Sequence, residues 1–312
     1  MQRRNIQHGV LVTNAFLRTN KFVEHYEWLA EAAKQYDIRL DLWDNTHVLT
    51  DFDDVSSGLP ESVDFVIFWD KDIPLATKLY QECLQRDIPM YNRPEAIALC
   101  DDKCRTYQAL AACQEYEFTL IPTIVAPMTY QGIGYGDAAF VDRIIERLSL
   151  PLVIKECFGS FGQQVYLARS REEVMEYTHR LAGVPFLYQK YMKPSHGVDV
   201  RIQVVGDQVV AAMKRRSVTE DFRANLSNGG CMERYEPSAA ECEIAVQAAK
   251  ALDLSFAGVD LLFAKGESHP ATVVCEVNSN AHFRNIAECT GVNTAQCIME
   301  MIVQESESRG TK

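Results

Sequence analysis

Three oxygen-bearing side chains lie at the ends of two apolar runs between Gly258 and Asn280 of this 312-residue chain. Asp260 opens the first run, and Glu276 and Asn278 close the second. Side chains alternate along a strand, so Glu276 and Asn278 point to one side, and a hairpin brings Asp260 near both. Two carboxylates repel unless a cation lies between them. The pattern predicts Mg²⁺ shared with nucleotide phosphates; three solvated residues at strand ends are the alternative.

A lysine and a glycine-rich turn lie upstream of this hairpin. Pro151 to Lys155 is typical of a strand, Gly159 to Gly162 of a turn, and Gln163 to Ala168 of a returning strand. Backbone amides in such a turn can bind phosphates, with the lysine adding charge. The turn differs from a P-loop because it has no GKS/T ending and no helix after it. An ordinary hairpin with a glycine turn is the alternative.

A basic segment follows, GVDVRIQVVGDQVVAAMKRRS, and its Gly206-Asp207 pair predicts a hairpin turn. Alternation places three polar side chains on one face of its first strand, namely Asp199, Arg201 and Gln203. The positive residues at the end of the second strand and beyond are Lys214, Arg215, Arg216 and Arg223. In an acidic chain this clustering indicates an anion, although charged side chains are more commonly solvated.

Composition limits the class of protein. The chain is 47% hydrophobic, which suffices for two or three domains with a sizeable core. Its net charge of -12 argues against nucleic-acid partners, which need a clustered basic surface. No run approaches a membrane-spanning length, and the N-terminal apolar segment is typical of a strand and not of a signal peptide. Ten scattered cysteines without a CxxC pair indicate reduced thiols, so we expect a cytoplasmic protein with no membrane partner.

Hydrophobic periodicity predicts the elements that position these residues. Strands and helices alternate from Gly9 to Tyr91, where the apolar run Val63 to Trp69 is typical of a central strand. Glu95 to Glu115 is helical in pattern but interrupted by DDK, and the glycine-rich segment from Gly132 to Gly136 is expected to be a loop. Further helices are expected at Phe140 to Leu148, Arg171 to Leu181, Glu241 to Leu252 and Thr294 to Val303, and a strand at Phe186 to Met192.

From about residue 92 to its end, the chain resembles the ATP-grasp superfamily, and within it the RimK-type amino-acid (α-L-glutamate) ligases. The matching segments are DDK at Asp101 to Lys103, VIKECFGSFGQQV, the basic hairpin, DFRANLSNGG, AGVDLL, EVNSN and TGVN. The resemblance implies an ATP-grasp fold of α/β and α+β class. An N-terminal α/β (pre-ATP-grasp) domain at 1–100 would precede a central subdomain at 101–190 and a C-terminal metal-binding subdomain at 191–312.

The resemblance also implies roles for individual residues. Lys103 and Lys155 would contact the α- and β-phosphates, under a loop from Ser160 to Gly162. The remaining nucleotide contacts would come from Gln189, Lys190 and Tyr191 near adenine, Asp199 near the ribose, and Arg223 and Asn225 at the nucleotide end. Asp260, Glu276 and Asn278 would hold Mg²⁺ or Mn²⁺, as two ions. Arg201 and Arg216 are the candidates for stabilising charge during the reaction.

The implied activity is that of an ADP-forming ligase. It would activate a carboxylate as an acyl phosphate with ATP and join it to an amine, with an amino acid or peptide as substrate. A homo-oligomer is expected. A nucleotide-binding regulatory subunit without turnover and a small-molecule kinase are the alternatives, and dependence of phosphate release on an added amine separates ligase from kinase.

The segment after Asn278 departs from the RimK pattern. It reads SNAHFRN where that pattern continues as ASPG, so glutamate specificity stays open. Asn280, His282 or Arg284 can meet substrate or can be packed or exposed residues. The residues Asn14, Asp70 and Lys71 fall at strand ends of the first domain, where α/β sites gather, and can equally be turn residues.

Overall fold

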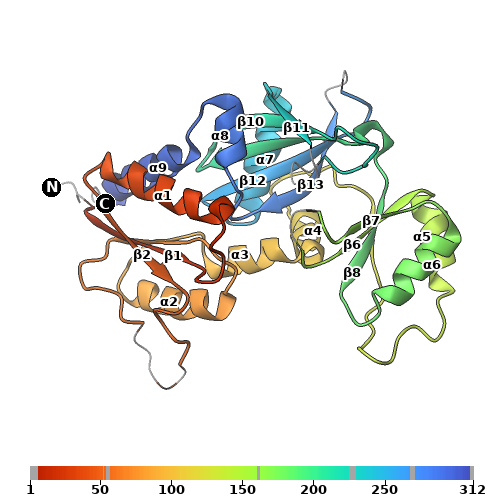
Figure 1. The fold of residues 1–312 in the computed structure, drawn as a ribbon, viewed down its shortest axis with the longest axis horizontal. Coiled ribbons are helices and arrows are strands. Elements are labelled where there is room, and N and C mark those ends of the chain that lie inside the picture. Colours follow the sequence, from red (N-terminus) through yellow and green to blue (C-terminus); the bar gives the residue numbers. More distant parts are fainter. Residues whose placement is uncertain are drawn as a thin grey trace.

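The fold is that of a computed structural model, which describes residues 6–51, 53, 57–159, 162–224, 230–267 and 271–309. Two predicted site residues, Ser160 and Asn225, lie outside the described residues. Three sheets follow one another along the chain, and helices lie on and between them (Figure 1). The first and last described residues, Ile6 and Arg309, lie together beside the first sheet.

The first sheet is parallel and has the strand order β2-β1-β3-β4. Its strands are β1 (His8–Thr13), β2 (Arg39–Asp44), β3 (Phe65–Phe68) and β4 (Met90–Tyr91), and its helices are α1 (Asn20–Lys34) and α2 (Ile73–Gln85). All four residues of β3 are buried, which confirms the prediction of a central strand. Asn14 directly follows β1 and Asp70 is the second residue after β3, so they meet at the carboxyl edge of adjacent strands.

The second sheet is antiparallel and has the order β5-β8-β6-β7. It contains β5 (Thr123–Val125), β6 (Leu152–Glu156), β7 (Val165–Ala168) and β8 (Phe186–Lys190), with α5 (Phe140–Leu148) and α6 (Arg171–Arg180) packed on its outer side (Figure 1). Helix α5 begins and ends at the predicted residues. The glycine-rich segment 132–136 forms a loop, as predicted.

The third sheet carries most of the predicted site. Its antiparallel order β11-β10-β9-β12-β13 consists of β11 (Cys231–Arg234), β10 (Gln208–Arg216), β9 (Val198–Val205), β12 (Phe256–Phe263) and β13 (Thr272–Asn278). On one face, alternate β9 side chains pack in a core with α7 (Ala239–Ala251), α3 (Pro94–Asp101) and α4 (Lys103–Ala112). Val200 and Ile202 are fully buried there, so the other face is left for polar groups.

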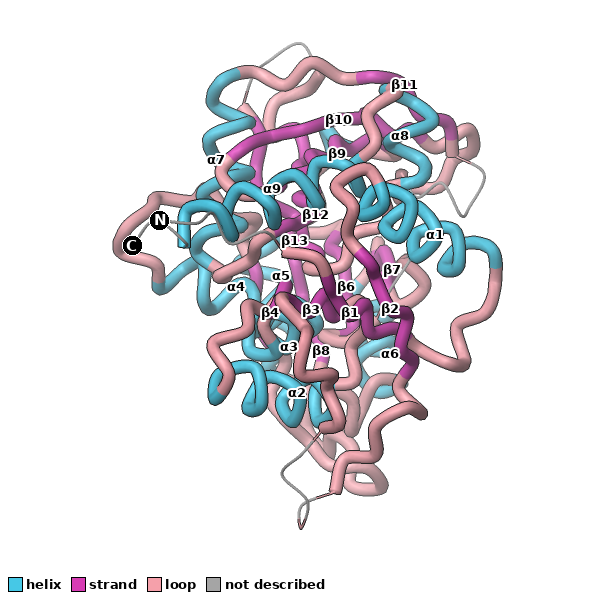
Figure 2. The backbone as a smooth tube through the Cα atoms, turned by 90° about the vertical axis from the view of Figure 1, so that its left-hand side faces the viewer, coloured by secondary structure: helices cyan, strands magenta, loops and turns pink. Residues whose placement is uncertain are grey.

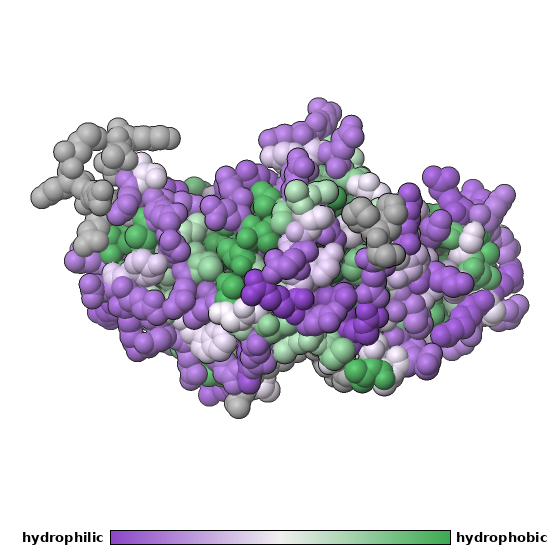
Figure 3. All heavy atoms as spheres, turned by 90° about the horizontal axis from the view of Figure 1, so that it is seen from above, coloured by the Kyte–Doolittle hydropathy of each residue, from purple (hydrophilic) through white to green (hydrophobic). Residues whose placement is uncertain are grey.

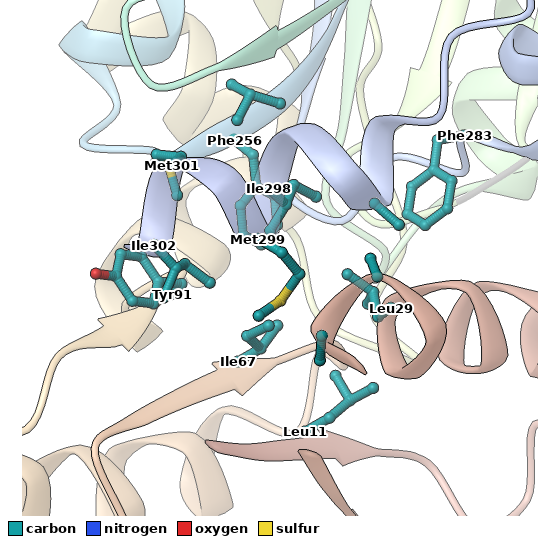
Figure 4. Close-up of a cluster of buried hydrophobic side chains, with 14 of the residues drawn as sticks. Leu11, Leu29, Ile67, Tyr91, Phe256, Phe283, Ile298, Met299, Met301 and Ile302 are labelled. Atoms are coloured by element: carbon teal, nitrogen blue, oxygen red, sulfur yellow. The ribbon is translucent and has the colours of Figure 1, made fainter. Parts of the chain in front are cut away.

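The last helices return to the start of the chain. Helix α9 (Thr294–Arg309) lies beside α1 in both views (Figures 1 and 2). Ile298 and Met299 of α9 point toward Ile67 of β3 and Leu29 of α1 (Figure 4). Helix α8 (Arg284–Thr290), which the sequence did not predict, precedes it. The shared core joins the first and third sheets.

The surface is consistent with the acidic composition. Seen from above, it is mostly hydrophilic, and hydrophobic residues are exposed in separate patches (Figure 3). Among the described residues, no helix is both long and apolar enough to cross a bilayer.

Asn92 links the loop after β4 to the third sheet and is fully buried. Its amide nitrogen donates to the carbonyls of Phe256 and Ser279 at 3.0 and 2.8 Å, and its oxygen accepts from the Ser255 amide at 2.8 Å. Because Asn92→Ala leaves these buried backbone groups without a partner, we expect the free energy of unfolding to fall by about 2–4 kcal/mol in urea titrations. Gln247→Ala, at a partly exposed position on α7, should change it by less than about 0.5 kcal/mol; equal effects would contradict the account.

Candidate active site

A cavity of about 460 Å³ lies where the three sheets meet. Its size is within the range of small-molecule sites, about 300–1,000 Å³. The second sheet and its loops contribute Lys155, Gly162 and Gln189; the third sheet contributes Arg201 and Asp260. Most of the predicted nucleotide and metal residues that the structure describes therefore line one shared space. They are Lys103, Lys155, Gly162, Gln189, Lys190, Tyr191, Asp199, Arg201, Arg223, Asp260, Glu276 and Asn278.

Strand register explains how the central residues come together. Asp260 on β12 lies directly opposite Arg201 on β9 and Glu276 on β13, and Asn278 lies opposite Gly258. Opposed residues in antiparallel strands share a face of the sheet. The predicted hairpin that brings Asp260 next to Glu276 is thus confirmed. Arg201 lies next to Asp260 on the neighbouring strand β9, on the side away from Glu276.

Asp260 is 5% exposed and is held by two arginines. Arg201 binds both of its carboxylate oxygens, at 2.7 and 2.6 Å, and Arg215 approaches Oδ2 at 3.1 Å. Burial raises the pKa of Asp260, but the two guanidiniums outweigh burial and hold it below the usual range. Arg215 also binds both oxygens of Asp199 at 2.7 Å. Two arginines and two aspartates thus form a closed network of charges.

Two lysines lie next to this network. Asp102 caps the start of α4 by accepting from the amides of Cys104 and Arg105. Lys103 follows directly, and its ammonium donates to the Gly159 carbonyl at 2.9 Å and lies 3.5 Å from Glu276. Lys155 reaches the thiol of Cys275 at 3.5 Å. Burial raises the pKa of that thiol, although Lys155 opposes the rise, so a neutral group faces the ammonium.

The described residues predicted to lie near adenine and at the nucleotide end form no network like that of the arginines and aspartates, and their hydrogen bonds go to residues outside this set. Gln189 is buried and donates to the Thr123 hydroxyl at 3.0 Å, while Lys190 is exposed. The Tyr191 hydroxyl is hydrogen-bonded to His196. Arg223 donates to the Gly162 carbonyl at 2.7 Å, so it connects the glycine turn to the third sheet.

Arg216 does not line the cavity, which corrects the prediction for this residue. It lies on the opposite face of β10, is 45% exposed, and binds Glu267 at 2.6 Å. The reason is a register shift between Val209 and Ala211, where one extra residue enters β10. An unshifted hairpin turns Arg216 toward the cavity, whereas the bulge turns Arg215 there instead. Arg215 is the cavity-lining arginine that the sequence prediction missed.

Part of the SNAHFRN segment lines the cavity. Asn280 and His282 line it, whereas Arg284 lies outside and pairs with Glu288 at 2.7 Å. The close approach depends on Gly258, since a Cβ at that position would lie 2.4 Å from the Cβ of Ala281. This packing brings the chain beyond Asn278 back against the sheet.

Comparison with known proteins decides the family. Residues 100–302 match the model of the RimK-like ATP-grasp domain. The chain belongs to the RimK-like ATP-grasp family. The predicted fold class is thereby confirmed, and solved ATP-grasp structures share it.

Relatives of this RimK-like chain include proteins named as ligases. A probable α-L-glutamate ligase 2 of Pseudoalteromonas atlantica is 29% identical over 96% of this chain and 97% of its own length. Human N-acetylaspartylglutamate synthase A is 31% identical over 71% of this chain, which spans about half (54%) of that relative. The RimK domain protein of Sphaerobacter thermophilus superposes with a TM-score of 0.66 at 17% identity, covering 94% of this chain and 98% of that one.

The RimK-like site has a donor set that suits a hard divalent ion. Asp260 accepts three hydrogen bonds, which leaves capacity for about one more contact on a carboxylate. Asn278 has a buried amide nitrogen with no hydrogen-bond partner, and rotating the amide by 180° turns its oxygen to the same place. No cluster of three or more acidic, histidine or cysteine ligands occurs among the described residues, so the set is two carboxylates and an amide.

Arg215 and Arg216 form a matched pair for testing the register. Arg215→Met leaves buried Asp199 without its partner, so we expect the free energy of unfolding to fall by about 3–5 kcal/mol. Arg216→Met removes a surface pair and should change it by less than about 1 kcal/mol. Urea titrations of both variants measure the free energy of unfolding. A larger decrease in Arg216→Met than in Arg215→Met would show that Arg216, and not Arg215, belongs to the charge network.

Proposed function

We propose that the protein is an ADP-forming carboxylate–amine ligase that activates its carboxylate substrate with MgATP as an acyl phosphate. One observation carries the proposal: the cations Lys103, Lys155, Arg201 and Arg215 line the same cavity as the donors Asp260, Glu276 and Asn278. Membership of the RimK-like family and the ligase relatives support an ATP-dependent carbon–nitrogen ligase.

The proposed reaction has two transfers. The γ-phosphoryl group of ATP passes to a substrate carboxylate oxygen, and ADP leaves. A neutral amine then adds to the acyl carbon, the carbon–oxygen bond to phosphate breaks, and the amine nitrogen loses a proton. Since the substrates supply both nucleophiles, no side chain has to form a covalent intermediate.

Each group of residues has a proposed part in this reaction. Lys103 and Lys155 bind and orient the phosphates, and Arg201 and Arg215 stabilise charge that develops at the reacting carboxylate. Asp260, Glu276 and Asn278 would hold Mg²⁺, which offsets charge between the β- and γ-phosphates when bound. We propose two ions, and the two oxygens of Glu276 would add to the donors available to hold them.

The cavity also favours a ligase over a nucleotide-only regulatory site. It continues beyond the phosphate-facing lysines to Trp69 and Asp70 of the first domain and to His282. That extension supports room for substrates beside the nucleotide.

ADP release tests the proposal directly. The protein is incubated with ATP, Mg²⁺ and pooled carboxylates and amines, and products are analysed by mass. We expect release that requires both substrates, stops with EDTA and returns with Mg²⁺ or Mn²⁺. Phosphorylated product without any need for an amine would instead identify a kinase, and ATP binding without turnover a regulatory subunit.

Glu276→Gln tests the metal-binding end. Losing a charged ligand should lower amine-dependent ADP release by about 100-fold or more. Glu233→Gln, which changes a surface partner of Lys214, is the matched control and should keep wild-type activity. Full activity in Glu276→Gln would remove this residue from the proposed metal site.

A further inference from the structure

The end of the cavity that faces the first domain contains a carboxylate with an unusual partner set. Every other carboxylate among the described lining residues pairs with a lysine or arginine: Asp101 with Lys71, Asp199 with Arg215, Asp260 with Arg201, and Glu276 with Lys103. Asp70 has no such partner. Its side chain accepts from the Asn14 amide at 2.9 Å, and it is 9% exposed. The hydrogen bonds to Asp70 come from neutral donors, and burial holds its pKa above the usual range although the nearby charge of Lys71 opposes the rise, so a cation that binds beside it is favoured.

Asn280 adds a second acceptor beside Asp70. Its amide nitrogen donates to the Asp70 backbone carbonyl at 3.1 Å, which fixes the orientation of the side chain. Its side-chain oxygen is buried and has no hydrogen-bond partner. A carboxylate and an unpaired amide oxygen together match a group that has several donors and no acceptor, which is the description of an ammonium.

Apolar side chains form the wall around these acceptors. Phe22 and Tyr26 lie one turn apart on α1, and both line the cavity with Leu17 and Trp69. Tyr26 is near Asp70, since burial and then the Asp70 charge raise its pKa to about 12. The wall therefore suits an apolar or aromatic substituent next to the ammonium.

This end offers little to a second carboxylate. Among the described lining residues of the first domain the one lysine or arginine is Lys71, and its ammonium is bound to Asp101. To be bound by a lysine or arginine on this side of the cavity, the side-chain carboxylate of glutamate would therefore have to break an existing ion pair. The chemistry of the pocket differs in this respect from that expected of a glutamate site.

We infer that Asp70 and Asn280 form the amine subsite, and that it takes a primary amine, protonated when free, with an apolar or aromatic substituent in preference to glutamate. The inference rests on the proposed ligase function and names one substrate class for it. Asn280 follows the proposed metal ligand Asn278 by two residues in the turn that ends β13, and both line the same cavity, so an amine bound here lies close to the proposed reacting centre.

Titration calorimetry of the full chain with MgADP tests the subsite without relying on turnover. The probes are 2-phenylethylamine, its uncharged counterpart 2-phenylethanol, and glutamate. Wild type should bind the amine at least about ten-fold tighter than either, and Asp70→Asn should weaken amine binding by about ten- to a hundred-fold while leaving the alcohol unchanged. Asn280→Ala, which keeps the carboxylate, should show a smaller loss.

The matched control is Asp142→Asn, the same change at a surface partner of Arg171, which should bind as wild type does. No preference for amine over alcohol in wild type, or an unchanged preference in Asp70→Asn, would overturn the inference. If Asp70→Asn does not fold, the Asn280→Ala variant tests the inference in its place. An affinity for 2-phenylethylamine equal to that of wild type in Asn280→Ala would also overturn the inference.

Hydroxylamine separates this inference from the ligase proposal. It is small and uncharged at neutral pH, so it can intercept an acyl phosphate without the ammonium subsite. Folded Asp70→Asn should still form hydroxamate from pooled carboxylates with MgATP. If hydroxamate forms but the protein does not prefer the amine to the alcohol, the ligase proposal stands and the amine subsite is rejected. If wild type forms no hydroxamate, the acyl phosphate is rejected.

Discussion

Four charges that are largely removed from water neutralise one another in the middle of the third sheet, and the arrangement of the site depends on them. Arg201 and Arg215 bind Asp260 and Asp199 through bidentate contacts on adjacent strands. Taking such charges out of water is costly, and removing any one partner leaves another unpaired. Because arginine stays ionised at all accessible pH, the network keeps the guanidiniums fixed and pointing into the cavity.

The sequence predicted the residue types of this site well because strand alternation and hairpin turns are local. The hairpin of Asp260 with Glu276 and the shared polar face of Asp199 and Arg201 follow from a period of two residues. Arg216, the candidate chosen with the family resemblance, shows what neither the resemblance nor strand alternation could supply. A single inserted residue in β10 reverses the face of everything after it, and a bulge has no signal in the alternation itself.

Long-range packing was also beyond the sequence pattern. The segment after Asn278 lacks the proline and glycine of the RimK pattern, and its sequence alone does not place it in the cavity. Its position follows from Gly258, where the absence of a side chain lets Ala281 approach the sheet, and from the contact of α9 with α1. Those contacts bring the first domain against the third sheet, so Asp70 and Asn280 can share a pocket although they are far apart in the chain.

The contact between the Asn280 amide and the Asp70 backbone has a mechanical consequence. Asn280 lies two residues beyond Asn278 at the end of β13, so a shift of that strand end would also move the amide oxygen that is proposed to face an amine. In the proposed sites, the metal ligand Asn278 and the amine acceptor Asn280 are therefore linked through one short piece of backbone. Under the same proposal, changes that adapt the pocket to a new amine would arise mainly on the α1 side, away from the proposed metal ligands.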